Sequence, residues 1–424
     1  MSNAVAFPSQ EVLYGQLYEE LSPALFVVET VERTSQSKSS VGSGFTVGGA
    51  GFIATNYHVV ASALLKPDQY QLRTQHQDGS ELEVEIAAVD PIHDLAVLRS
   101  LPLAQPDKAT STQVPNATPK RGLHFAALRP AVGDPLLALG NPLDIGLSLV
   151  PGTYNGNMKK DYRSRIHFTG ALNPGMSGGP AVNTAGEVVG INVAGAGNSV
   201  GFLVPATHLE ALISRAESGS QSLAEQKAQF GDMVRAHQAA LVDDLLAGNW
   251  ELQPFGPLKI PKEVRDYVNC TGAANELDAD AKWRQSVSNC TVNDRVFLSR
   301  RLDTGPVEMY FAVYESDDLS AIQFANLFAG GTFSPNNRGS TDDLTTYDCV
   351  ERWTRLPKLG EQRFKASYCL RAYLDYPDLY DVLYVARAMP SATQGLYVHY
   401  TLAGVGRESA QRFHDKLLGS LEWN

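Results

Sequence analysis

The sequence lacks several features that would place it in a class of protein at once. It has no apolar run of about 18 residues, the length that a membrane-spanning helix needs. It carries 35 basic and 46 acidic side chains, a net charge of −11, and no long Lys/Arg block, which argues against nucleic acid or an anionic membrane as the main partner. Its cysteines lack the C-x2-C spacing of a zinc site, and we expect neither a metal nor a cofactor.

A secretion signal is also missing, because MSNAVAFPSQ has neither a charged segment nor a long apolar one. The letters SNA after Met1 are typical of a cloning remnant, so we expect a natural signal to have been removed. The compartment must therefore be inferred from the cysteines.

The four cysteines form two pairs, each with nineteen residues between its members. An even count is compatible with two disulfides, and we pair Cys270 with Cys290 and Cys349 with Cys369. Each bridge would close a short loop and contribute about 3 kcal/mol to stability. Disulfides imply an oxidising compartment, so we expect a periplasmic or secreted protein. Four buried free thiols in a cytosolic protein are the alternative.

The chain divides into three parts by its pattern. Short strands separated by Gly, Pro and Asn turns run from about Phe26 to Pro205 and predict an all-β barrel or sandwich, with the polar segment Leu103 to Arg121 as a long loop in its middle. After Pro205 the pattern becomes helical, and Ser222 with Glu225 forms a capping box. We therefore expect a β domain over 12–216, a helical linker over 217–249 and an α+β domain over 250–424.

The α+β region repeats one order of features. Cysteine, nineteen residues, cysteine, strands and a helix occur twice after Trp250. This order is compatible with an internal duplication and with coincidence inside a single α+β domain. The tyrosines of the region are more typical of a core than of a ligand platform.

The stretch NPGMSGGPAV, Asn173 to Val182, crowds glycines and prolines around Ser177. A serine hydroxyl is a weak nucleophile at neutral pH, so catalysis needs a base and donors for the oxyanion that forms. Gly175 can turn its amide toward the same point as the amide of Ser177, with Met176 between them. The two following glycines clear space for a substrate backbone.

The base is expected to be His58 in GFIATNYHVVASA, where an apolar strand meets a short helical segment. Asp94 in VDPIHDLAVLRS directly precedes an apolar strand and would orient the histidine and stabilise its imidazolium. Asp90 is the competing carboxylate, and His93 is read as a surface neighbour. Each motif alone is compatible with a turn, a core histidine or a strand cap, but together they indicate a nucleophile, a base and an acid.

These residues lie in segments that resemble trypsin-like serine proteases of the chymotrypsin fold, and among them the HtrA/Deg branch. The resembling segments, from Gly42 to Ala206, are GSGFTV, TNYHVV, DLAVLRS, LGNPL, NPGMSGGPAVNTAGEVVGIN and VGFLVPA. The resemblance implies two six-stranded β-barrels with the active site between them. It also implies that Ser177 is the nucleophile, His58 the base and then acid, and Asp94 the orienting carboxylate, with an oxyanion hole at Gly175, Met176 and Ser177.

The resemblance also places the primary specificity pocket. Its base and wall would be formed by Ala171, Leu172, Val193, Ala194 and Gly195, none of which is acidic. We therefore expect a small or medium apolar P1 residue rather than Arg or Lys. His167 is a strand histidine in this interpretation, with an approach to the pocket and an acidic P1 as the alternative.

The chain departs from the HtrA/Deg branch at two points. Met176 stands where bacterial members usually carry Asn or Asp, and the cysteine-bearing region replaces any PDZ signature. The leading hypothesis is a serine endopeptidase acting on proteins or peptides. The alternative is a catalytically restrained chaperone or peptide-binding protein, held inactive by the loop Asp144 to Lys160, with a C-terminal adaptor domain for a protein partner. An oligomer is compatible with either.

Overall fold

The computed structural model divides the chain into two compact units, residues 1–158 with 163–230, and residues 159–162 with 231–424. The structure describes residues 10–48, 51–101, 122–195, 197, 199–219, 222–274, 282–330 and 339–424. The predicted loop Leu103 to Arg121 lies outside the described residues. None of the described helices is long and apolar enough to cross a membrane.

The first half of unit 1 is an antiparallel sheet in the order β5-β4-β1-β2-β3-β7-β6. β5 and β6 stand at opposite ends of this order, yet only Glu83 separates them in the sequence. The sheet therefore curls back on itself, and the single strand predicted for ELEVEIAAV is split in two. The strands are β1 (Leu25–Glu32), β2 (Lys38–Val47), β3 (Phe52–Thr55), β4 (Tyr70–His76), β5 (Glu81–Leu82), β6 (Val84–Asp90) and β7 (Leu95–Ser100).

The second half of unit 1 is a closed barrel of six strands in the order β10-β13-β12-β11-β8-β9. The predicted strand LHFAAL is not continuous, because Leu123 and Phe125 form only isolated bridges to Val47 and Val188. The strands are β8 (Pro135–Gly140), β9 (Ser148–Asn157), β10 (Ile166–Phe168), β11 (Pro180–Val182), β12 (Val188–Gly195) and β13 (Gly201–Pro205).

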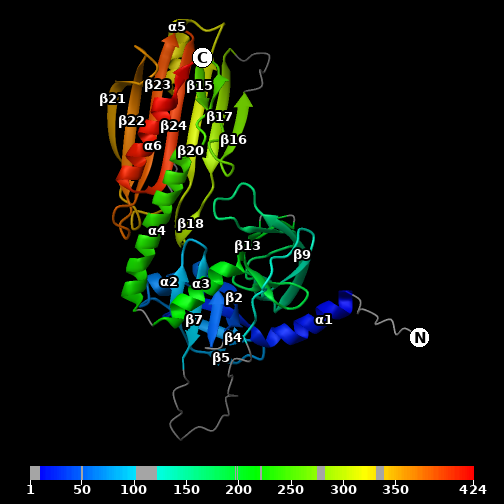
Figure 1. The fold of residues 1–424 in the computed structure, drawn as a ribbon. Helices are drawn as coiled ribbons and strands as arrows, with labels where there is room; N and C mark the ends of the chain where they lie inside the picture. Colours follow the sequence, from blue (N-terminus) through cyan, green and yellow to red (C-terminus); the bar gives the residue numbers. More distant parts are fainter. Residues whose placement is uncertain are drawn as a thin grey trace, which may run out of the picture. The chain divides into compact units, whose positions relative to one another are not determined.

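Helices and short 3-10 turns complete unit 1 (Figure 1). α2 carries five buried aliphatic residues that pack it onto the first sheet, so its polar second residue, His58, stays partly accessible. The predicted capping box at α4 is confirmed, since Ser222 Oγ accepts from the amide of Glu225 at 3.2 Å and Glu225 accepts from the amide of Ser222 at 2.8 Å. The elements are α1 (Gln10–Leu21), η1 (Ser22–Ala24), α2 (Tyr57–Leu65), η2 (Pro142–Asp144), α3 (Ala206–Glu217) and α4 (Leu223–Leu246), the last of which continues into unit 2.

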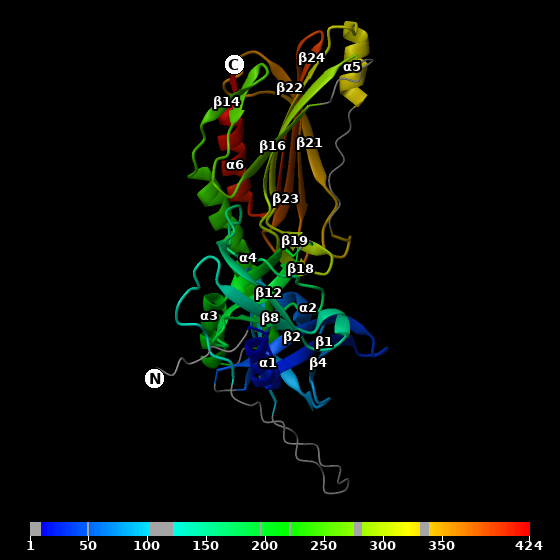
Figure 2. The ribbon, with the colours of Figure 1, turned by 90° about the vertical axis from the view of Figure 1, so that its right-hand side faces the viewer.

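Unit 2 is built on a seven-stranded antiparallel sheet in the order β16-β17-β20-β24-β23-β22-β21. α6 packs Phe413 and Leu417 into the core on one face of this sheet, and α5 lies at its other side (Figure 2). The sheet strands are β16 (Asn269–Ala274), β17 (Arg284–Val292), β20 (Val307–Glu315), β21 (Asp348–Arg355), β22 (Arg363–Ala372), β23 (Tyr380–Ser391) and β24 (Gln394–Val405). The other elements are β14 (Leu252–Phe255), β15 (Leu258–Pro261), β18 (Val296–Ser299), β19 (Leu302–Thr304), α5 (Ala321–Gly330), α6 (Arg407–Ser420) and β25 (Glu422–Trp423).

Both predicted disulfides are present. Cys270 is bonded to Cys290, and Cys349 to Cys369, and the members of each pair lie directly opposite each other on neighbouring strands. The bridges join β16 to β17 and β21 to β22, the two outermost strand pairs of the sheet. Each edge strand is therefore covalently tied to its inner neighbour.

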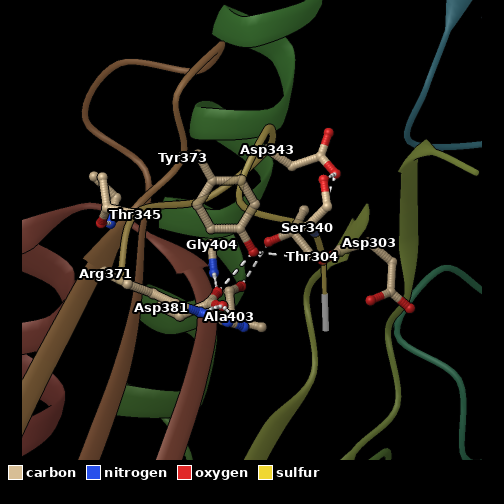
Figure 3. A network of polar contacts seen from close by, with 11 residues as sticks. Asp303, Thr304, Ser340, Asp343, Thr345, Arg371, Tyr373, Asp381, Ala403 and Gly404 are labelled. Carbon is tan, nitrogen blue, oxygen red and sulfur yellow. Dashed lines mark hydrogen bonds and ion pairs between the residues drawn. The ribbon is translucent and has the colours of Figure 1, made fainter. Parts of the chain in front are cut away.

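A buried ion pair fixes one end of this sheet (Figure 3). Asp381 accepts hydrogen bonds from Arg371 Nε at 2.8 Å, from the Tyr373 hydroxyl at 2.7 Å and from the amide of Gly404 at 3.0 Å. Arg371 and Asp381 are both 7% exposed, so the carboxylate is stabilised by these donors rather than by water. Gly404 has a φ of +69°, and a Cβ there would lie 1.6 Å from Thr304 Oγ1, which leaves room for glycine alone.

Candidate active site

The structure brings His58 and Asp94 into direct contact. His58 is the second residue of α2, and Asp94 lies in the turn between β6 and β7. His58 Nδ1 and Asp94 Oδ2 are 2.6 Å apart, and Asp94 Oδ1 accepts from the amide of His58 at 2.8 Å. One carboxylate therefore both orients the imidazole and satisfies a free amide in the first turn of the helix.

The backbone of Asp94 is held as firmly as its side chain. Its φ of +56° lies in the left-handed region, which Asp tolerates better than most residues. Its carbonyl accepts from the amide of Tyr57 at 3.1 Å and from Asn56 Nδ2 at 2.7 Å. Asn56 and Tyr57, which directly precede His58, thus hold the backbone of Asp94, and the carboxylate of Asp94 in turn binds His58.

The environment changes the protonation of His58. Burial disfavours the imidazolium, but the charge of Asp94 and its hydrogen bond outweigh this effect, so the pKa of His58 is raised above its ordinary value. The His58 side chain is still 29% exposed, which leaves one side of the ring accessible. The imidazole is thus a stronger base than a free histidine.

The competing carboxylate, Asp90, serves a different histidine. Asp90 Oδ2 lies 2.8 Å from His93 Nδ1, and Asp90 Oδ1 accepts from the amides of Ile92 and His93. The His93 ring stacks on His208 of α3 with 3.6 Å between centroids. Burial and the neighbouring His93 lower the pKa of His208 to about 4. The turn that carries Asp94 is therefore pinned by its own capping network.

Ser177 lies in the turn that leads into β11. Two glycines of this turn, Gly175 and Gly178, occupy positions where a side chain would clash with the backbone. Gly175 has a φ of +95°, and a Cβ there would lie 2.3 Å from the carbonyl oxygen of Asn141. Gly178 has a φ of +88°, and a Cβ there would lie 2.3 Å from the carbonyl oxygen of Ser43. The hydroxyl of Ser177 donates to the carbonyl of Val193 at 2.9 Å.

The backbone amides around Ser177 differ in whether they donate a hydrogen bond within the protein. The amide of Met176 donates to the carbonyl of Asn173 at 3.1 Å, and its side chain is fully buried. Within the described residues, the amides of Gly175 and Ser177 donate no hydrogen bond to the protein. Of the three residues predicted for an oxyanion hole, two therefore have an amide available.

Ser43 of β2 is a site residue to which the sequence analysis gave no role. Its hydroxyl donates to the carbonyl of Gly175 at 2.7 Å and accepts from the amide of Asn141 at 2.9 Å, while its amide donates to the carbonyl of Ser177 at 2.7 Å. It thus ties the first sheet to the nucleophile turn. Its place in the GSGF segment was the available signal for a role of Ser43 in the site. A serine in a strand does not by itself predict a hydrogen-bond partner over 130 residues away.

The loop after β8 holds the other side of the same turn. The amide of Leu143 donates to the carbonyl of Pro174 at 2.8 Å, which fixes the peptide plane that carries the Gly175 amide. Leu143 takes a left-handed φ of +52°, and Asn141 closes the loop through bonds to Asp144 and the amide of Gly146. The direction of the Gly175 amide therefore depends on the LGNPL segment.

A cavity of about 250 Å³ opens beside Ser177. Of the residues predicted for a specificity pocket, Leu172, Val193 and Gly195 line it, whereas Ala171 is exposed and lies outside the lining. The side chain of Ala194 is outside the described residues. His167 is absent from the lining, and no charged residue of the described part contributes to it. Among the described residues, no group of three or more His, Cys, Asp or Glu side chains is placed to hold a metal ion.

Unit 1 thus combines a closed β-barrel and a second, curled sheet with a direct His58–Asp94 contact. Residues 42–191 match the model of the trypsin-like peptidase domain. The chain thus contains a segment that matches this domain, and it is similar in sequence to HtrA and DegP-like serine proteases.

The curated relatives match over part of their length. Serine protease HTRA3 of Homo sapiens is 29% identical over 251 residues, which are 55% of this chain and 51% of the relative. A probable periplasmic serine endoprotease DegP-like of Chlamydia pneumoniae is 26% identical over 352 residues, 76% of this chain and 67% of the relative. The serine endoprotease structure from Yersinia pestis has 26% identity and a TM-score of 0.38, covering 50% of this chain and 68% of that one. This chain spans about half the length of the first of these relatives.

Proposed function

We propose that this protein is a serine endopeptidase that cleaves peptide bonds through an acyl-enzyme intermediate. The observation that carries the proposal is the His58–Asp94 pair in a domain whose Ser177 turn presents two uncommitted amides. The roles are Ser177 as nucleophile, His58 as general base and then acid, and Asp94 as the orienting carboxylate.

The chemistry follows from the positions of these groups. Asp94 binds Nδ1 of His58, so the neutral ring carries its proton there and presents Nε2 as the acceptor. Nε2 takes the Ser177 proton as the hydroxyl oxygen attacks the substrate carbonyl, and it then gives that proton to the leaving amine. The Ser177 hydroxyl first leaves the Val193 carbonyl by rotation about its Cα–Cβ bond, which frees that carbonyl for a substrate amide.

The amides of Gly175 and Ser177 would stabilise the oxyanion. Fixed donors aimed at the developing charge contribute more than donors that must reorient, and loss of one typically costs about 100- to 1,000-fold in rate. Ser43 and Leu143 fix the two peptide planes of Gly175, so they are positioning residues in this proposal.

A small or medium apolar P1 side chain is the preference that the cavity supports. Its volume of about 250 Å³ and its lining by Leu172, Val193 and Gly195 exclude a good partner for Arg or Lys. Proteins or peptides are the proposed substrates. Two disulfides, together with relatives whose names include the word periplasmic, support an oxidising compartment, periplasmic or extracellular.

Substitution of the nucleophile tests the proposal. Ser177→Ala should lower peptide hydrolysis by several orders of magnitude, because the three groups act as a unit. A fluorophosphonate probe should label the native chain at Ser177 and leave the variant unlabelled. Failure of labelling in a chain that still binds peptide would instead support the restrained chaperone, and full hydrolysis by a contaminant-free Ser177→Ala preparation would refute the serine mechanism.

The arrangement of unit 2 supports a second, structural proposal, an internal duplication. The strand order places β16, β17 and β20 on one side and β24, β23, β22 and β21 on the other, with a disulfide at each outer pair. The first set of strands precedes α5 and the second precedes α6.

A further inference from the structure

We propose that the C-terminal domain binds a single-chain amphiphile with a carboxylate headgroup. The site is a cavity of about 1,100 Å³ on the face of the large sheet opposite α6, between β21, β22, β23 and α5. It lies wholly within unit 2, and the proposal does not depend on the peptidase function.

One end of the cavity is apolar. Leu383 and the Cys349–Cys369 disulfide lie side by side across three strands, since Cys369 pairs with both Cys349 and Leu383 in the register. Val385 lies two residues further along β23, on the same face of the sheet. None of these groups can pair with a charge, so this end favours a hydrocarbon chain.

The other end carries positively charged side chains whose mutual repulsion destabilises the domain. Lys365 and Arg387 lie directly opposite each other on β22 and β23, and both line the cavity. Like charges in opposed positions of an antiparallel pair repel each other. Arg363 is on the same wall, with its guanidinium 5.3 Å from the centre of the Trp353 ring.

Cations outnumber carboxylates among the described lining residues of this end, where Arg387 also contacts the ring of Tyr397. Among the described lining residues, Glu351 is the single carboxylate against three cations, and it lies 3.4 Å from Lys365 with 63% of its side chain exposed. A bound carboxylate between Lys365 and Arg387 would remove the repulsion and form charge-assisted hydrogen bonds. Charge complementarity therefore selects an anionic headgroup.

The two ends are separated along the strands by a length that suits a medium chain. Leu383 and Arg387 are four residues apart on β23, which corresponds to about 13 Å in a strand. Polarity thus changes along one continuous wall, from the disulfide to the opposed cations. A peptide would instead require polar partners along its whole backbone, and the side chains of the apolar end offer only the hydroxyls of Tyr347 and Ser367.

Titration of the full chain with three probes tests the assignment. Decanoate carries both chain and carboxylate, acetate lacks the chain, and decyltrimethylammonium reverses the charge. We expect calorimetry below the critical micelle concentrations to show saturable binding of decanoate alone, with a change in Trp353 fluorescence that disappears in Trp353→Phe. Binding should weaken as salt is raised.

Matched variants locate the two ends. Lys365→Gln with Arg387→Gln should weaken decanoate binding about 10- to 100-fold, whereas Arg352→Gln, which removes a cation next to Trp353 outside the lining, should leave it unchanged. Val385→Glu should weaken it at the apolar end, and Gln323→Glu on α5, outside the lining, should not. Thermal unfolding without ligand checks folding, and the opposed-cation variant should be at least as stable as the native chain.

Equal binding of decanoate and decyltrimethylammonium, or no loss in the Lys365/Arg387 variant that unfolds normally, would overturn the proposal. Binding of an acidic peptide in preference to decanoate would also overturn it. Because no readout uses Ser177, an inactive peptidase and an empty amphiphile site are distinguished directly.

Discussion

Ser43→Ala is the perturbation that separates positioning of the oxyanion hole from the chemistry of the triad. Ser43 is 2% exposed, and its hydroxyl bonds the carbonyl of Gly175 and the amide of Asn141. Alanine preserves the strand and removes both bonds. One acceptor and one donor are then left buried without a partner.

The magnitude follows from those two bonds. A buried polar group left unsatisfied costs about 1–3 kcal/mol, so the two together should lower the free energy of unfolding by about 2–6 kcal/mol. Loss of the Gly175 anchor releases the peptide plane between Gly175 and Met176, whereas the plane that carries the Gly175 amide keeps its bond from Leu143. Displacement of one donor without its removal should cost less than the 100- to 1,000-fold of a deleted donor, and we expect kcat to fall about 10- to 100-fold with KM little changed.

The assay is hydrolysis of a chromogenic peptide with a small apolar P1 residue, with active sites counted by a fluorophosphonate titration. Ser40→Ala is the matched control, because Ser40 lies on the same strand and its hydroxyl has no hydrogen bond to another described residue. A Ser43→Ala chain that loses stability as expected but keeps the native kcat would refute the positioning argument and leave Ser43 a purely structural residue.

Four further outcomes are expected. Asp94 raises the pKa of His58, and the base must be neutral to act, so activity should rise with pH through that pKa. Asp94→Asn should lower the rate and move the acid limb of the pH–activity profile to lower pH. An acid limb that does not move would contradict the assignment of Asp94. The same raised pKa means that the His58–Asp94 ion pair stabilises the fold fully below about pH 6.5 and loses this contribution as pH rises through the folded value, which thermal unfolding of native and Asp94→Asn chains should show. Gly175→Ala should abolish most activity because its Cβ would lie 2.3 Å from Asn141 O, whereas Gly133→Ala, where nothing lies within 4 Å of the new Cβ, should cost only backbone strain. Reduction of the two disulfides should destabilise the C-terminal domain by about 3 kcal/mol per bridge in denaturant titrations, and an unchanged midpoint would show that the cross-links constrain little.

The sequence by itself determined the elements that local chemistry specifies. Glycines and prolines around Ser177 mark a sharp turn, the Ser222 capping box marks a helix start, and equal cysteine spacing marks two short cross-links, each of which is present in the structure. Alternating apolar residues between Gly/Pro turns predicted a β domain for the same reason, since the side-chain period of a strand is visible in the chain.

Only the tertiary structure decided which distant groups meet. Whether Asp90 or Asp94 binds His58 depends on the path of a five-residue turn, and the fold gives Asp94 to His58 and Asp90 to His93. The link from Ser43 to Gly175 and the opposed Lys365 and Arg387 depend on strand register, which sets contacts across many residues at once. A sequence displays the period of each strand but not its partner, because pairing is fixed by the packing of the whole sheet.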